Sequence, residues 1–275
     1  MRTKTHPIQI HPLPCNYPPL QREMGEATEL NFPEVIGGIL SEEQMAVFYE
    51  TMKSVVVRVE VYSHEYSSFD CEGAGVFVSS RHILTLSTLL NDDKKAQVLV
   101  KTQNDTEIGC RVSYLDAKMG LAILEIENSS SSQHFLFAKI SDKKLKIGAQ
   151  VYCIGHPGYL DYSFPVGHIS YPCLTYGEFM KSMGKDQKVS IEEITMDPSA
   201  MFICYVPEVD DLSLKSSVKL VQLNNVHGDG LAGARGMPVF NSLGHIIGLY
   251  LFESRDQCYP VHAKTLRAFI RRSET

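Results

Sequence analysis

Hydrophobic and polar residues alternate with a period of two along most of the chain, and this pattern is typical of half-buried β-strands. In the run "VVVRVEVY", three valines alternate with Arg58, Glu60 and Tyr62. The first half of the chain therefore predicts six short strands. The five runs that follow the first begin at Gly73, His82, Ala96, Gly109 and Leu121.

The second half of the chain carries a similar series of strand-like runs. Between residues 172 and 216 the spacing loosens, and the polar segment there predicts a long surface loop. About twelve short strands in two groups of six predict two small antiparallel barrels, over about 54–140 and about 145–262. The runs of this series begin at Ala149, His168, Met201, Ser217, Met237 and Cys258, and the turn "NSLG" divides the one at Met237.

Helical spacing occurs at both ends of this strand-rich region. Ser41 and Gln44 form the signature of a capping box, and the apolar residues after them recur every three or four positions. This predicts a helix over about 42–53 whose aromatic residues pack into the core. The segment "AKTLRAFIRR", with arginines in its last turn, predicts a terminal helix over 263–272. Residues 1–40 hold six prolines and predict a disordered tail.

Composition and charge narrow the range of partners. The 275 residues carry a net charge of −6 and a pI of about 5.9, which argues against a nucleic-acid partner. The chain has no polybasic run and no apolar run of about 18 residues, so no membrane partner is expected. The N-terminus lacks a secretory signal, so an intracellular location (cytoplasm, nucleus or plastid) is favoured.

The cysteines and glycines predict no metal site and no cofactor. The seven cysteines are odd in number and most stand in apolar runs, which indicates buried, reduced thiols. Cys153 and His156 have ligand spacing, but no second pair follows them. The run "GDGLAGARG" lacks the Lys-Ser/Thr of a nucleotide-binding loop and leads into a strand.

Five segments in order resemble the HtrA/Deg (Do-like) branch of the trypsin-like serine proteases, from about residue 55 to 270. The resemblance implies a trypsin-like pair of six-stranded antiparallel barrels with a cleft between them. Because the chain stops after its terminal helix, the PDZ domain of many relatives is expected to be absent. The segments are "GAGVFVSSRHILTLSTLL", "DAKMGLAILEIE", "LKIGAQVYCIGHPGYLDYSFPVGHIS", "VQLNNVHGDGLAGARGMPVFNSLGHIIGLY" and "CYPVHAKTLRAFI".

The resemblance places all three catalytic positions of the family on residues that are unable to perform the chemistry. The family's histidine falls at Thr88, its aspartate at Gly120 and its serine at Arg235. A serine protease needs a nucleophile, a base and a group that orients the base. Threonine is no base near neutral pH, glycine has no side chain, and arginine offers only donors.

The loop around Arg235 keeps part of the family's sequence, because "GNSGGP" of the family is "GARGMP" here. A remnant oxyanion loop of Gly233, Ala234, Arg235 and Gly236 is therefore the expected binding element. The amides of Gly233 and Arg235 are its expected donors. Arg235 is also expected to present a cation at the centre of the cleft, which favours an acidic segment.

The resemblance thus implies a catalytically inactive serine-protease-like protein, a pseudoprotease, that binds a peptide or protein partner by strand addition. Two alternatives stay open. One is an active serine endopeptidase with a rearranged site that uses Ser87 or Thr88 with His227 and Asp229. The other is a regulatory subunit that assembles with active relatives, since HtrA/Deg proteins are typically oligomeric.

Overall fold

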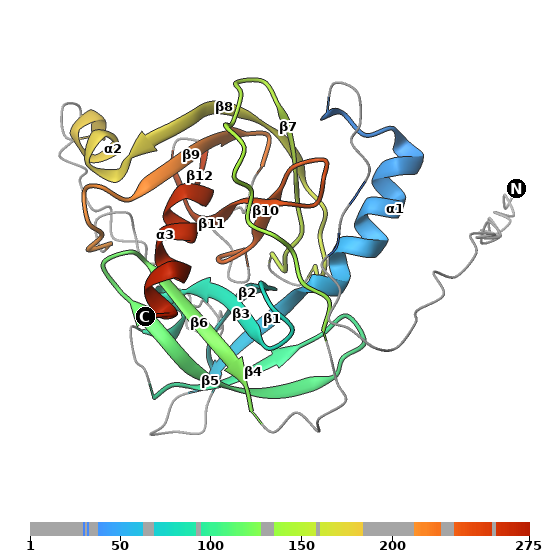
Figure 1. Ribbon diagram of the computed structural model, residues 1–275, viewed down its shortest axis with the longest axis vertical. Coiled ribbons are helices and arrows are strands. Elements are labelled where there is room, and N and C mark those ends of the chain that lie inside the picture. Colours follow the sequence, from blue (N-terminus) through green and yellow to red (C-terminus); the bar gives the residue numbers. More distant parts are fainter. Residues whose placement is uncertain are drawn as a thin grey trace, which may run out of the picture.

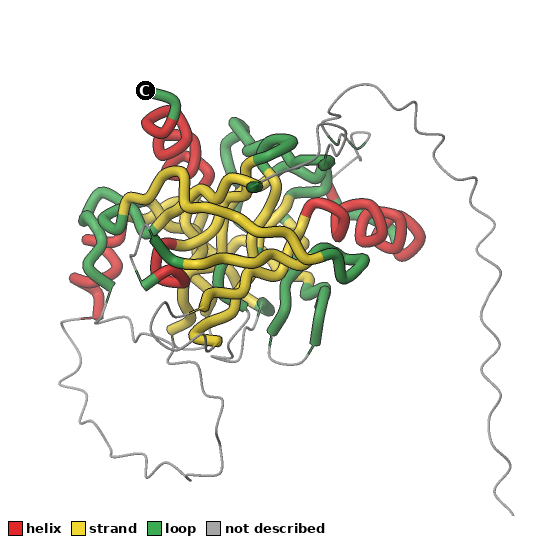
Figure 2. The backbone as a smooth tube through the Cα atoms, turned by 90° about the horizontal axis from the view of Figure 1, so that it is seen from below, coloured by secondary structure: helices red, strands yellow, loops and turns green. Residues whose placement is uncertain are grey.

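The structure is a computed structural model. It describes residues 30, 32, 38–62, 69–91, 95–127, 135–157, 160–183, 212–226, 234–254 and 257–275. Within these ranges, twelve strands close into two barrels of six strands each (Figure 1). The strands fill the middle of the molecule and the helices lie at its periphery (Figure 2). The predicted all-β fold of two six-stranded antiparallel barrels is confirmed.

The first barrel contains β1 to β6. Val57, Val59 and Val61 of β1 are buried in its core, as their alternation predicts. The strand predicted at His82 is shorter than expected, because the chain turns into the 3-10 helix η3 (Ser87–Leu90). The strands are β1 (Val56–Tyr62), β2 (Phe69–Phe77), β3 (His82–Leu86), β4 (Gln97–Lys101), β5 (Glu107–Asp116) and β6 (Leu121–Ile126). Around the barrel they follow the order β1-β2-β3-β6-β5-β4.

The second barrel contains β7 to β12. Its core includes Val151, Leu223, Val239 and Leu249, which are all fully buried. The strands are β7 (Gln150–Cys153), β8 (Val166–Thr175), β9 (Lys219–Asn224), β10 (Pro238–Phe240), β11 (Ile246–Ser254) and β12 (Gln257–His262). Their order around the barrel is β10-β11-β12-β9-β8-β7.

One polar position of β1 departs from the predicted alternation. Glu60 is only 2% exposed although its neighbours in the pattern predict a solvent-facing residue. Its carboxylate lies 3.2 Å from Nε of Arg58 and 3.0 Å from Nζ of Lys101. Arg58 also contacts Asp161 of the segment after β7, at 3.4 Å. Ion pairs therefore cover the outer face of β1 and link it to the second barrel.

The predicted helices at the two ends of the strand-rich region are confirmed. Helix α1 (Glu42–Met52) begins with a complete capping box between Ser41 and Gln44. Its Phe48 is fully buried, with its ring centroid 5.0 Å from that of Tyr152, so the aromatic stripe packs into the core. A 3-10 turn, η2 (Lys53–Val55), leads from α1 into β1. Helix α3 (Ala263–Ser273) follows β12, and no helix in the described part of the chain is long and apolar enough to cross a membrane.

The prediction of a long surface loop between residues 172 and 216 is wrong for the first part of that segment. Residues Tyr176–Met183 form helix α2 directly after β8. Glu178 accepts hydrogen bonds from the backbone and the hydroxyl of Thr175, and Thr175 Oγ1 accepts from the Glu178 amide. This is a capping box, and its Thr-x-x-Glu signature is visible in the sequence.

Several predictions fall on residues outside the described ranges. They include most of the tail, the strand at Met201 and the middle of the 172–216 segment. Among the described cysteines, Cys71, Cys110, Cys153 and Cys258 are buried and form no disulfide, and Cys173 is half-buried. These thiols have the reduced, mostly buried state that the sequence predicts.

Candidate functional site

The segment that corresponds to the family's nucleophile lies where the two barrels meet. Residues Ala234–Gly236 lead into β10 of the second barrel. The carbonyl of Arg235 accepts a hydrogen bond from the amide of Ala74 in the first barrel, at 2.7 Å. The amide of Gly236 donates to the carbonyl of Tyr250 on β11, at 2.9 Å. We call residues 234–236 together with β2 residues 71–75 the junction.

Two glycines allow the backbones at the junction to approach closely. Gly236 has a φ of +80°, and a Cβ atom there would lie 2.1 Å from the carbonyl oxygen of Ala74. A Cβ atom on Gly73 would lie 2.7 Å from the carbonyl oxygen of Arg235. Glycine is the residue type that fits both positions, which explains the second glycine of "GARG" and the first of "GAG".

Arg235 turns its side chain into the protein. The residue is 4% exposed, and its Nη2 donates to the Sγ of Cys71 at 3.0 Å. Its Nε has no acceptor. The expectation that Arg235 presents a cation to a bound segment is therefore wrong for this structure, because the guanidinium lies beneath the junction and not on its surface.

The backbone of Arg235 keeps one feature of a catalytic loop. Among the described residues, its amide N–H has no hydrogen-bond acceptor. A spare amide at the nucleophile position is one half of an oxyanion hole. The other expected donor, Gly233, lies outside the described residues, as do His227 and Asp229 of the rearranged site.

The histidine-equivalent and aspartate-equivalent positions lie side by side. Thr88 stands in η3, and the amide of the preceding residue, Ser87, donates to the carbonyl of Gly120 at 3.1 Å. Ser87 is buried and its Oγ has no partner. No described histidine forms a hydrogen bond with Ser87 or Thr88. The described residues thus bring the three positions to one region but supply neither hydroxyl with a base.

The backbone at position 120 disfavours an aspartate, and the end of the Leu214 side chain lies close to it. Gly120 has a φ of +73°, and a Cβ atom there would lie 2.9 Å from Cδ2 of Leu214. The nearest carboxylate along the chain, Asp116, is engaged elsewhere. It lies 3.6 Å from Nζ of Lys215 and 3.7 Å from Nη1 of Arg272. The turn is therefore packed without an orienting carboxylate.

Two histidines elsewhere in the fold have strongly shifted pKa values. Burial lowers the pKa of His156 to about 4, and its contact with Asp161, at 3.1 Å, offsets this only in part. Burial and nearby cations lower the pKa of His262 to about 4, and its Nδ1 caps helix α3. A third histidine, His82, starts β3, and its Nδ1 lies 2.8 Å from Ser79 Oγ. None of these rings contacts the junction through a hydrogen bond.

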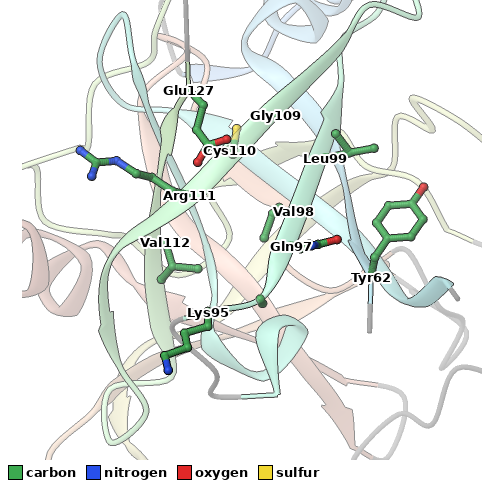
Figure 3. A pocket seen from close by; sticks show the side chains of 11 residues that line it. Tyr62, Lys95, Gln97, Val98, Leu99, Gly109, Cys110, Arg111, Val112 and Glu127 are labelled. Atoms are coloured by element: carbon green, nitrogen blue, oxygen red, sulfur yellow. The ribbon is translucent and has the colours of Figure 1, made fainter. Parts of the chain in front are cut away.

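A cavity in the described part of the first barrel is separate from the junction. It measures about 590 Å³ and lies against β4 and β5 of the first barrel (Figure 3). Cys110 and Glu127 lie next to each other in its wall (Figure 3). Burial and the nearby Glu127 carboxylate raise the pKa of the Cys110 thiol to about 12, so it stays protonated at neutral pH.

Sequence reasoning placed the three substituted positions but missed the residues that surround them. Cys71 and Leu214 lie far along the chain from the positions that they contact, and no motif marks either residue. No group of described His, Cys, Asp and Glu side chains is arranged to hold a metal ion.

Comparisons with known proteins bear on this architecture. Residues 73–249 match the family model of the trypsin-like peptidase domain. The crystal structure of the Rv3671c protease in its inactive form is similar with a TM-score of 0.58 at 13% identity, over 83% of this chain and 93% of that chain. The active form of Rv3671c from M. tuberculosis gives 0.57 at 14% identity, over 82% of each chain. No curated protein matches the chain.

Proposed function

The chain belongs to the trypsin-like peptidase domain family, and from this premise we propose that it is a pseudoprotease of the HtrA/Deg type. In this proposal it has lost peptidase chemistry and binds an extended peptide or protein segment at the junction. The sequence resemblance and the substituted positions Thr88, Gly120 and Arg235 support the proposal together.

The backbone at Gly120 carries the argument for lost chemistry. Its φ of +73° is a conformation that an aspartate rarely adopts, so an orienting carboxylate is disfavoured there. The Arg235 side chain is buried at the position that the resemblance gives to the nucleophile. Together these two observations support the proposal of a site without a working triad.

The expected loss of rate is large. Removal of a complete triad lowers turnover by about 10⁶-fold and leaves roughly 10³–10⁴ over water, from the oxyanion hole and substrate binding. A spare amide at Arg235 preserves at most part of that remainder. Peptide turnover is therefore expected to be below ordinary detection.

The backbone of the junction supports binding. An extended segment binds a protease-type fold through main-chain hydrogen bonds, which do not require catalytic side chains. The Arg235 amide supplies one unused donor, and the 2.7 Å bond from Ala74 to the Arg235 carbonyl holds that amide in place. Because the guanidinium is buried, we expect selection by shape and main-chain bonding rather than by an exposed cation.

The first test is hydrolysis of a broad fluorogenic peptide library by the purified full chain, with Arg235→Ala as the matched control. The proposal expects no turnover above that control and no covalent labelling by a fluorophosphonate. Turnover that a fluorophosphonate blocks would refute it and would favour the active endopeptidase. Loss of labelling in Ser87→Ala would then identify the nucleophile.

The second test measures binding and its location in the same protein. An unfolded polypeptide, β-casein, is added, and amide hydrogen exchange is followed across the chain. We expect slower exchange at residues 234–237 and along β11, with unchanged exchange in β4 and β5. If casein protects no amide at the junction, binding there is refuted. Assembly with an active relative by size exclusion would then favour the regulatory subunit.

A further inference from the structure

Arg235 is a buried cation without a carboxylate partner. Its guanidinium is always charged, and the residue is 4% exposed. No ion pair in the described part of the chain includes Arg235, and its Nε has no acceptor. A buried charge that is neither paired nor fully hydrogen-bonded is strongly unfavourable. The arrangement therefore requires a counter-charge at the one side-chain atom that the guanidinium contacts.

That atom is the sulfur of Cys71. The Sγ of Cys71 lies 3.0 Å from Nη2 of Arg235, and 3.8 Å from the carbonyl oxygen of Glu72, to which a thiol would be only a weak donor. An uncharged thioether in the same protein, that of Met119, lies 3.4 Å from Nη1 of Arg272. Hydrogen bonds between ionised groups are shorter than those to neutral acceptors. A neighbouring guanidinium also favours the thiolate over the thiol.

We propose that Cys71 and Arg235 form a thiolate–guanidinium ion pair, and that Cys71 is a modification site for small oxidants of the peroxide class. Both residues belong to the junction, but the ion pair forms within the protein and does not require that a peptide be bound there. The second, independent observation is that Nε of Arg235 has no hydrogen-bond acceptor. The other described residues therefore leave the charge of this guanidinium uncompensated, and a thiolate at Cys71 would compensate it.

The other buried cysteines of the described ranges have the opposite environment. Burial raises the pKa of Cys110, Cys153 and Cys258, and no cation contacts their sulfurs in a hydrogen bond. They remain protonated and unreactive near neutral pH. Cys173 is half-buried on β8, and its rate is measured in the same sample for comparison.

The modification step is a two-electron oxidation of sulfur. The Cys71 thiolate attacks one oxygen of hydrogen peroxide, an S–O bond forms and the O–O bond breaks. The other oxygen leaves as hydroxide, which the buffer in solution protonates to water, and the cysteine becomes a sulfenic acid. The peroxide is reduced as the sulfur is oxidised. The guanidinium stabilises the negative charge that moves from sulfur to the leaving oxygen.

The test compares alkylation rates of the cysteines in the folded full chain between pH 6 and pH 8. Iodoacetamide is used with isotope-coded mass spectrometry, so that each cysteine has its own rate. An ordinary thiol slows by roughly 100-fold over this range, because its thiolate fraction falls. We expect Cys173 to follow that slope and Cys71 to slow by less than about threefold. Parallel slopes for the two cysteines would overturn the proposal.

Two variants separate charge from packing. Arg235→Met keeps the length of the side chain without its charge and should return Cys71 to the slope of Cys173. Arg235→Lys keeps the charge and should keep the flat profile. An unchanged profile in Arg235→Met would overturn the ion pair. After peroxide treatment, a sulfenic-acid probe should label Cys71 in the wild type, and failure to do so would refute the modification site.

An absorbance measurement does not require access to the sulfur. Thiolates absorb near 240 nm, so the difference between wild type and Cys71→Ser reports the ionisation of Cys71 alone. The proposal expects this difference to persist at pH 6 and to disappear in acid. A difference that emerges only above about pH 8 marks an ordinary thiol and overturns the ion pair even if no reagent reaches the site.

Discussion

Replacement of Gly236 with alanine tests how closely β2 contacts the nucleophile-equivalent segment. The new Cβ would lie 2.1 Å from the Ala74 carbonyl oxygen, and the φ of +80° adds conformational strain of about 1–2 kcal/mol. Relief of the clash would move Ala74, which donates to Arg235 and accepts from Thr85 Oγ1 at 2.9 Å. Each of these buried bonds is worth about 1 kcal/mol, or about 1–3 if a partner is left unsatisfied. The expected loss is about 3–8 kcal/mol.

Gly148→Ala is the matched control. Gly148 has a φ of +77°, but no atom lies within 4 Å of the position of its Cβ. Only the conformational strain remains there, about 1–2 kcal/mol. Urea unfolding of the three proteins, followed by circular dichroism, gives the free energies of unfolding. If Gly236→Ala costs no more than Gly148→Ala, the close contact between β2 and the segment is refuted.

Two further predictions concern catalysis and pH. The triple variant Thr88→His, Gly120→Asp, Arg235→Ser is expected to remain inactive toward peptides, because Leu214 and the left-handed backbone at position 120 prevent the aspartate from reaching the histidine; fluorophosphonate labelling at position 235 would show that this packing argument is wrong. The pKa of His156, about 4 in the folded state, lies below the ordinary value of about 6.5, so protons bind the unfolded chain more readily. The contribution of His156 to the free energy of unfolding is therefore complete above about pH 6.5 and falls toward pH 4, with a loss of about 2 kcal/mol at pH 5. Urea unfolding at pH 7 and at pH 5 should show this loss, and the variant His156→Asn should show a smaller one. An equal loss in the variant would contradict the assignment to His156.

The fold could be predicted from local patterns because each strand carries its own signal. The alternation of β1 predicted which valines point inward, and "NSLG" predicted the turn between β10 and β11. Glu60 departs from the pattern because Arg58 of the same strand and Lys101 of β4 form ion pairs with it and cover it. The alternation of polar and apolar residues contains no information on such ion pairs. Helix α2 was missed although Thr175 and Glu178 mark its start.

The assignment of the catalytic positions to Thr88, Gly120 and Arg235 stays a prediction from the resemblance. The structure adds that Ser87, next to Thr88, bonds Gly120 and that Ala74 bonds Arg235. The direction of the Arg235 side chain depends on Cys71, which is 164 positions away along the chain. Long-range side-chain contacts of this kind depend on how the barrels pack, and no single segment encodes them. The same holds for Leu214 beside Gly120.

The contact between Leu214 and Gly120 has a consequence for the evolution of this protein. An aspartate at position 120 alone meets a methyl group 2.9 Å away and a backbone φ of +73°. A smaller residue at position 214 alone removes packing from the turn, and a serine at position 235 alone has no base. Under the proposed function, no single substitution at these positions restores hydrolysis, because a nucleophile, a base and an orienting carboxylate are all needed together.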